Sequence, residues 1–141
     1  AGLWFLQNPR SNDGNGVGYP RALAESDRVA LGTDGYPSDL DVEAEHLLRL
    51  AGEHGDPRPA VEARLTAGHA LAEELFGLPF VPFAPGSAAD VVVREEGRVR
   101  EGVVAGRRVV EDGRLAAADL DEIHAEAREQ APRLWERMAA I

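Results

Sequence analysis

The chain has 141 residues, of which 44% are apolar, so it can form one hydrophobic core, whereas a complete (β/α)8 barrel needs roughly 250 residues. Its 25 acidic and 15 basic side chains give a net charge of −10, which argues against nucleic acid as a partner because phosphate backbones bind basic patches. The absence of cysteine excludes disulfide bonds, thiolate metal ligands and a cysteine nucleophile.

The N-terminal segment predicts a strand followed by a loop. Leu3 to Leu6 is an apolar run typical of a short buried strand, and Asn8-Pro9 ends it because proline cannot continue a central ladder. Residues 8–18 contain three glycines, three asparagines and one proline, which is a loop composition. The segment lacks the basic region and cleavage pattern of a signal peptide, and no apolar run approaches the roughly 20 residues that cross a bilayer. We therefore expect a cytoplasmic protein without membrane contact.

A second buried strand is predicted at Val29 to Leu31, and it ends in the turn Gly32-Thr33-Asp34-Gly35. Asp34 at its tip is a candidate catalytic residue, because barrel enzymes gather their chemistry at the C-terminal ends of the strands. The alternative is that Asp34 only caps this turn or the following helix. Ser11 and Asn12 are weaker candidates for substrate contacts, since such side chains also hydrogen-bond the backbone of their own loop.

A weakly helical connection is expected at residues 19–27, before this strand, and two helices are expected after it. Ser38 is a plausible N-cap of the first helix, and Gly52 and Gly55 end it. Its apolar residues at helical spacing are Leu40, Ala44, Leu47, Leu48 and Ala51. Asp56-Pro57 begins the second helix, in which Thr66 is expected to cap a separate second piece that Gly77 ends. The predicted buried stripe of that piece is Ala67, Ala70, Leu71 and Leu75.

The C-terminal part predicts a small antiparallel β unit and a long helix. A proline-rich linker at residues 79–85 leads to strands at residues 91–93, 99–104 and 107–111, and Ala105-Gly106 suits a tight hairpin turn. Asp119 begins a capping box, and Pro132 is expected to kink or split the helix near Arg128. The apolar stripe of this helix is typical of a core or an interface and consists of Leu120, Ile123, Ala127, Leu134, Trp135, Met138 and Ile141.

Five motifs follow one another along the chain, at residues 8–12, 29–35, 63–68, 86–93 and 103–113. In this order and spacing they resemble the C-terminal third of the metal-dependent amidohydrolase superfamily, and within it the aminohydrolase and deaminase branch of the SsnA type. The resemblance covers essentially the whole chain. It implies an α/β fold, with the last strands and helices of a (β/α)8 barrel in residues 1–80, part of a small β-sandwich domain in residues 81–115, and a C-terminal helix in residues 116–141.

The resemblance also implies a chemistry. Family members hydrolyse carbon–nitrogen bonds other than peptide bonds, and the expected reaction is deamination of a small-molecule cyclic amidine or other nitrogen heterocycle. The acid that Asp34 resembles ligates a divalent metal, zinc or iron, and accepts a proton from the water that the metal activates. Ser11 and Asn12 lie in the loop that borders the active site of this family.

The other metal ligands of the family are missing from the sequence. The His-x-His pair is absent, and the four histidines, His46, His54, His69 and His124, lie in predicted helices or loops. We therefore expect the chain alone to bind no catalytic metal tightly and to be inactive. The sequence is then a fragment, a chain that needs an N-terminal amidohydrolase portion or a second copy as its partner, or a remnant. The alternative function is a catalytically inactive binding or assembly module, because unpaired strands of an incomplete barrel favour association.

Overall fold

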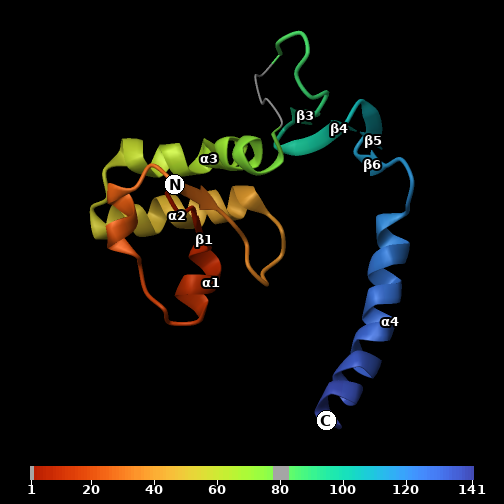
Figure 1. The fold of residues 1–141 in the computed structure, drawn as a ribbon. Coiled ribbons are helices and arrows are strands. Elements are labelled where there is room, and N and C mark those ends of the chain that lie inside the picture. The colour runs from red at the N-terminus through yellow and green to blue at the C-terminus, as the bar shows by residue number, and fades with distance from the viewer. Residues whose placement is uncertain (1, 78–82) are drawn as a thin grey trace. The chain divides into compact units, whose positions relative to one another are not determined.

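The computed structural model describes residues 2–77 and 83–141, which belong to two compact units, Ala1–Phe83 and Ala84–Ile141 (Figure 1). Within the described residues there are four α-helices and two small sheets, so the fold is mixed α/β. Residues 79–82 of the predicted linker lie outside the described part. Among the helices of the described ranges, none combines the length and the hydropathy that crossing a bilayer demands.

The first unit is built on two parallel strands, β1 (Phe5–Gln7) and β2 (Val29–Leu31). A short helix, α1 (Pro9–Gly14), and a 3-10 helix, η1 (Arg21–Glu25), connect them. The predicted strand at Val29 to Leu31 is confirmed, and its first two residues are buried. Because the strands are parallel, their C-terminal ends meet at one edge, where α1 and the turn with Asp34 begin.

The strand predicted at Leu3 to Leu6 is present, shifted to Phe5–Gln7, but the prediction that its apolar residues are buried is wrong. Leu3, Phe5 and Leu6 are exposed, Leu6 by 60% of its surface, and Gln7 is the buried residue of β1. In the part of the chain that the structure describes, β1 pairs with β2 on one side and has no strand on its other side. Its apolar side chains are left uncovered, whereas the amide oxygen of Gln7 accepts a hydrogen bond from buried Arg64 at 2.9 Å.

Residues 9–14, which the composition assigned to a loop, form helix α1. Pro9 is its first residue, where the fixed φ of proline suits a helix and the missing N–H removes no hydrogen bond. The side-chain oxygen of Asn12 accepts a hydrogen bond from the backbone N–H of Asn8 at 3.3 Å, which satisfies a donor at the helix start. A helix of six residues is too short to show the periodicity on which sequence-based prediction depends.

Helix α2 (Leu40–His54) is present as predicted, but its cap is Asp39 rather than Ser38. The Asp39 carboxylate accepts hydrogen bonds from two backbone N–H groups of the first turn, both at 3.1 Å. Gly55 ends the helix in the left-handed conformation, with φ at 74°, as expected, whereas Gly52, which was also expected at the end, lies inside the helix. The buried face differs from the predicted one, because Leu40 and Leu48 are exposed. Its buried residues are Glu43, Leu47, Leu50 and Ala51.

Helix α3 (Arg58–Phe76) is continuous, so the prediction of two pieces separated at Thr66 is wrong. The Thr66 hydroxyl donates to the carbonyl of Ala63 at 3.4 Å, inside the helix, which removes the need for a break. The predicted stripe near Leu75 is exposed or half-buried, and the buried residues are Val61 and Arg64. The N-terminal part of α3 lies against β2 and packs with Leu47 and Ala51 into the core.

The second unit contains a four-stranded antiparallel sheet whose strands pair in chain order. The strands are β3 (Val91–Glu95), β4 (Arg98–Val104), β5 (Arg107–Glu111) and β6 (Arg114–Leu115). Two-residue turns join them, and both residues of each turn have positive φ, as type I′ turns require. The predicted hairpin turn at Ala105-Gly106 is confirmed, with φ of 48° and 76°.

Helix α4 (Leu120–Ala139) ends the chain. Its predicted cap is confirmed, because the Asp119 carboxylate accepts hydrogen bonds from the N–H groups of Asp121 at 2.8 Å and Glu122 at 3.2 Å. Pro132 does not split it, since the helix continues on both sides of this residue. Proline removes one backbone donor, and the remaining hydrogen bonds keep a 20-residue helix intact. None of the residues of α4 is buried.

Candidate functional site

The candidate site lies at the edge where β1 and β2 end. Asn8 follows β1 directly, and Gly32 follows β2 and donates its N–H to the carbonyl of Gln7 at 2.9 Å. The Asn8 side chain packs against Gly32 so closely that a β-carbon there would collide with its amide oxygen. Glycine at position 32 therefore lets the loop after β1 lie directly against the loop after β2, two residues before Asp34.

Asp34 and Ser11, which the sequence proposed separately, are in direct contact. The Ser11 hydroxyl donates a hydrogen bond to Oδ2 of Asp34 at 2.6 Å. Ser11 is buried, whereas Asp34 is exposed. Asp34 has φ at 50°, a left-handed conformation that costs a non-glycine residue free energy and that recurs at functional sites. This contact joins the loop after β1 to the tip of β2 and holds one oxygen of the carboxylate in a fixed place.

Asn15 was not predicted from the sequence, but its side chain hydrogen-bonds Ser11. The Asn15 amide donates to Oγ of Ser11 at 3.1 Å and to the backbone carbonyl of Ser11 at 2.9 Å. Because its oxygen accepts this bond, the Ser11 hydroxyl is oriented with its proton toward Asp34. The four-residue spacing between Ser11 and Asn15, one helical turn, is the sequence signal that could have found this residue.

The side-chain hydrogen bond of Asn12 is to the backbone of its own segment and not to Asp34. Its side-chain oxygen accepts the hydrogen bond from the backbone N–H of Asn8 that begins α1. The sequence left open whether Asn12 contacts a substrate or its own loop, and the observed bond is of the second kind. Its half-buried position at the same end of the strands keeps it near the candidate site.

A buried ion pair fixes α1, and with it Ser11, on α2. Glu43 is fully buried, and its two carboxylate oxygens accept hydrogen bonds from Arg10, one from the backbone N–H at 3.1 Å and one from Nε at 2.7 Å. The Arg10 guanidinium also donates to the carbonyl of Pro37 at 2.6 Å. Because Arg10 precedes Ser11, these bonds position the residue that holds Asp34.

A second polar cluster lies within the first unit around Arg64, which is 2% exposed. Its guanidinium donates to Asp56 at 2.9 Å, to Gln7 at 2.9 Å and to the hydroxyl of Tyr19 at 3.3 Å. The Tyr19 hydroxyl in turn donates to Asp56 at 2.6 Å. Burial raises the pKa of Tyr19 above 10.0, and its hydrogen bond to Asp56 acts in the same direction.

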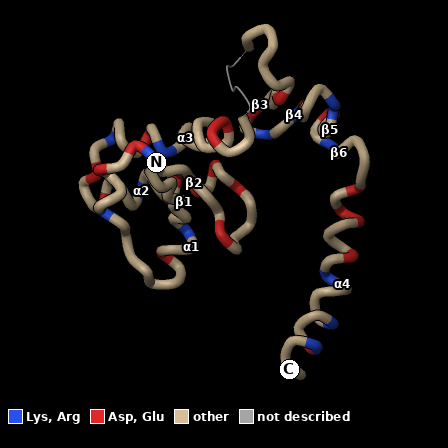
Figure 2. The backbone as a smooth tube through the Cα atoms, viewed as in Figure 1, with Lys and Arg blue, Asp and Glu red and all other residues tan. Residues whose placement is uncertain are grey.

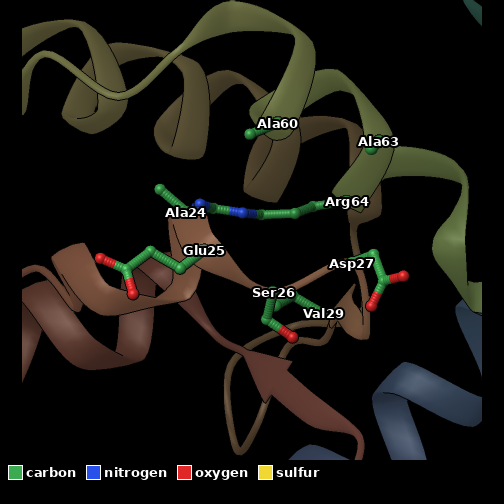
Figure 3. Close-up of a pocket in the computed structure, with 8 residues that line it drawn as sticks. All are labelled: Ala24, Glu25, Ser26, Asp27, Val29, Ala60, Ala63 and Arg64. Atoms are coloured by element: carbon green, nitrogen blue, oxygen red, sulfur yellow. The ribbon is translucent and has the colours of Figure 1, made fainter.

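Arg64 crosses a cavity of about 290 Å³ between η1, β2 and α3 (Figure 3). The labelled side chains in this view show Ala60 and Ala63 on α3, while Glu25 and Asp27 direct their carboxylates away from the guanidinium. In the described residues, Nε of Arg64 is buried without a hydrogen-bond partner. The cluster links β1, the loop before η1 and α3, so we interpret it as structural support for the strand ends.

The histidines do not gather around Asp34. His46 contacts Asp13 at 2.9 Å on the surface between α1 and α2, and the His54 ring stacks on Tyr19 at 4.7 Å between centroids. Across the described ranges, no three residues among histidine, cysteine, aspartate and glutamate are arranged to hold a metal ion. Asp34 is therefore a single carboxylate at the strand ends, without further metal ligands from this part of the chain.

A scan against models of protein families gives no family that fits the chain, and a search of solved structures gives no significant similarity.

Proposed function

We propose that this chain is the C-terminal segment of a metal-dependent amidohydrolase, which hydrolyses a carbon–nitrogen bond other than a peptide bond and deaminates a cyclic amidine or related nitrogen heterocycle. The observation that carries the proposal is the position of Asp34. This exposed carboxylate lies at the C-terminal end of a parallel strand and is oriented by buried Ser11. Barrel enzymes place their catalytic acids at such strand ends.

The two parallel strands support a place in a larger sheet. Parallel sheets normally occur with both faces covered and with several strands, yet β1 has exposed apolar side chains at Phe5 and Leu6. Strands added beside β1 and β2 would cover these side chains and complete a barrel wall. In this proposal the first unit supplies the last strands and helices of a (β/α)8 barrel, and the second unit supplies part of a small β-sandwich domain and the C-terminal helix.

The residues that the structure describes do not complete a metal site by themselves. Asp34 offers one carboxylate, and a catalytic zinc site normally has three protein ligands. The imidazole ligands would have to come from other strands of the barrel or from another chain, so we derive no reaction step through the metal. The bound metal would supply an activated water and a Lewis acid. Within this chain, the hydrogen bond from Ser11 to Oδ2 holds the carboxylate of Asp34 in place.

The first test is the intact mass of the polypeptide that contains Asp34, measured in an extract of the native cells by top-down mass spectrometry. A species several times heavier than 15.1 kDa agrees with the proposal. A native species near 15.1 kDa, without a companion chain that carries the histidine ligands, contradicts it and favours a catalytically inactive module.

The second test uses the native polypeptide and measures ammonia release from a panel of cyclic amidines. Asp34→Asn is expected to abolish turnover, because the amide cannot accept a proton. Ser11→Ala is expected to lower activity by about 10- to 100-fold, the usual effect of removing a group that orients a ligand. The matched control is Asp13→Asn, which changes an exposed acid of the neighbouring helix α1. Equal activities for the Asp34 and Asp13 variants would refute the role of Asp34.

A second candidate function, an assembly module without catalysis, is supported by the same exposed apolar side chains on β1. An open strand edge pairs readily with another chain. Under this function the Asp34 and Ser11 variants would leave partner binding unchanged, whereas lysine in place of Leu6 would abolish it. Co-purification from the native extract, followed by mass spectrometry of each variant, separates the two functions.

A further inference from the structure

We propose that helix α4 is a self-association surface on which a second copy of this chain docks its own α4 in the antiparallel direction. This inference concerns a part of the molecule that the proposed chemistry at Asp34 does not use. It rests on three properties of α4: an uncovered apolar stripe, a stripe spacing that is the same in both directions, and a charge gradient along the helix.

The apolar stripe of α4 is uncovered over the whole length of the helix. None of its large apolar side chains is buried, and their exposed fractions run from 45% at Ile123 to 60% at Trp135. Ile141, two residues beyond the end of the helix, is also fully exposed. Leu120, Ala127, Leu134 and Ile141 repeat every seven residues, as on helices that pair along a seam. The stripe is therefore suited to packing against another helix, and the described residues of its own unit do not bury it.

The spacing of the stripe selects an antiparallel partner. Trp135 lies toward one side of the stripe, and the other six residues are separated by steps of 3, 4, 7, 4 and 3, a series that is identical when the order is reversed. These six residues are Leu120, Ile123, Ala127, Leu134, Met138 and Ile141. If a second copy is related by a two-fold axis that passes between Gln130 and Ala131, the apolar side chains of the two helices lie at the same positions along the helix axis. Leu120 would then meet Ile141 of the other copy, and the small Ala127 would meet the large Leu134.

The charges of α4 favour the same arrangement. From Asp119 to Glu129 the helix carries five acids and one arginine, whereas residues 130–141 carry two arginines and one acid. Figure 2 shows this change from red to blue along α4. A parallel copy would place acid beside acid, but an antiparallel copy places each acidic half beside a basic one. In the proposed register, Glu126 lies near Arg133 of the other copy, on the flank of the stripe.

Two further features suit a symmetric pair. Antiparallel helices place opposite ends of their dipoles side by side, which is favourable. A two-fold arrangement uses the same patch on both copies and closes on itself, so it gives a dimer rather than a fibre. Pro132 lies on the side of α4 opposite the stripe, two positions from Leu134, so its missing N–H does not face the partner.

The association is tested with the full chain by sedimentation equilibrium over a range of concentrations. The wild type is expected to approach twice the chain mass of 15.1 kDa as concentration rises. Leu134→Lys should raise the dissociation constant at least about tenfold, because a charge replaces a central apolar contact. Ala125→Lys, which adds the same charge on the opposite side of α4, should leave the constant unchanged. A wild type that stays monomeric at all concentrations overturns the proposal, as does equal weakening by both lysines.

A charge exchange tests the partner and its direction. Glu126→Arg and Arg133→Glu should each weaken the dimer, because like charges then meet across the two-fold axis. The double variant E126R/R133E should restore much of the affinity. Arg133 also bonds Glu129 of its own helix at 3.1 Å, but this bond is lost equally in the single and double variants that carry R133E. If the dimer affinity of E126R/R133E is no higher than that of R133E, the proposed register is refuted.

Spin labels measure the direction independently, and the absence of native cysteine makes a single site unambiguous. In Ala139→Cys, the two labelled positions of an antiparallel pair lie about 25 Å apart along the helix axis, from a rise of about 1.5 Å per residue. A parallel pair would bring the labels to about 10 Å, the usual distance between packed helices. The long distance is expected, and the short one would overturn the antiparallel assignment.

Discussion

Replacing Arg64 with methionine should destabilise the first unit more than any surface change on the same helix. Arg64 is 2% exposed, and its carboxylate partner Asp56 has a side chain that is 6% exposed. Methionine fills a similar volume but leaves the Asp56 charge buried with one hydrogen bond, from Tyr19, and leaves the Gln7 amide without its donor. Breaking a buried ion pair on one side costs about 3–5 kcal/mol of unfolding free energy, because the remaining charge has no compensation.

The matched control is Arg58→Met, at the start of the same helix. Arg58 pairs with Glu62 one turn further on, but the Arg58 side chain is 80% exposed, so the pair is screened by solvent. The expected loss is about 0.3–0.5 kcal/mol, the usual value for exposed pairs of this spacing. The two variants remove the same kind of side chain from one helix and differ in burial, so their difference isolates the buried cluster.

Urea unfolding followed by tryptophan fluorescence measures both variants. The chain has two tryptophans, Trp4 in the first unit and Trp135 in the second, so a Trp135→Phe background makes the signal specific for the first unit. R64M should lose 3–5 kcal/mol or be unfolded before urea is added, and Asp56→Asn added to it should recover part of the loss, by about 1–3 kcal/mol. A loss for R64M within about 1 kcal/mol of that for R58M would refute the reasoning.

Three further outcomes are expected. Because the pKa of Tyr19 is raised in the folded state, the unfolded chain loses this proton at a lower pH than the folded chain. The free energy of unfolding should therefore fall as the pH rises above 10.0. Urea unfolding at several pH values should show this slope for the wild type and no such slope for Tyr19→Phe. Hydrogen bonds from Trp4 and Arg28 hold the pKa of Glu74 below 4.5, so acidification through this range should change Trp4 emission, and Glu74→Gln should abolish the change. Asp119→Ala should lower the stability of α4 by about 1 kcal/mol, because the cap of the helix is lost. Amide exchange should become faster at the N-terminal end of α4, and the helical circular dichroism signal of the chain should decrease.

Signals that act within a few residues were visible in the sequence. The cap at Asp119, the left-handed ends at Gly55 and Gly77 and the turn at Ala105-Gly106 each follow from the conformations that single residues allow. These features were correctly predicted because no distant residue can change them. The strand at Val29 to Leu31 was also correct, since its apolar run between polar turns fits a buried strand.

Features that depend on distant partners were not visible. Burial of Glu43 and Arg64 requires partners 33 and 57 positions away, and sequence patterns assign charged residues to the surface. Conversely, Leu3 and Leu6 were expected to be buried because they are apolar, but exposure depends on whether another layer covers them. At the candidate site, Asp34 and Ser11 could be proposed individually, whereas their 2.6 Å contact follows only from the parallel pairing of β1 and β2.

The two units differ in how far apart their contacting residues lie along the chain, and this sets the order in which they should fold. Each pair of neighbouring strands in the sheet of β3 to β6 is joined by two residues, so its contacts are local and its loops cost little entropy to close. The first unit must instead bring β1 to β2 across 21 intervening residues and Gln7 to Arg64 across 57 positions. Topologies with local contacts fold faster than those with distant ones. The C-terminal meander should therefore form early and without help from the segment that carries Asp34.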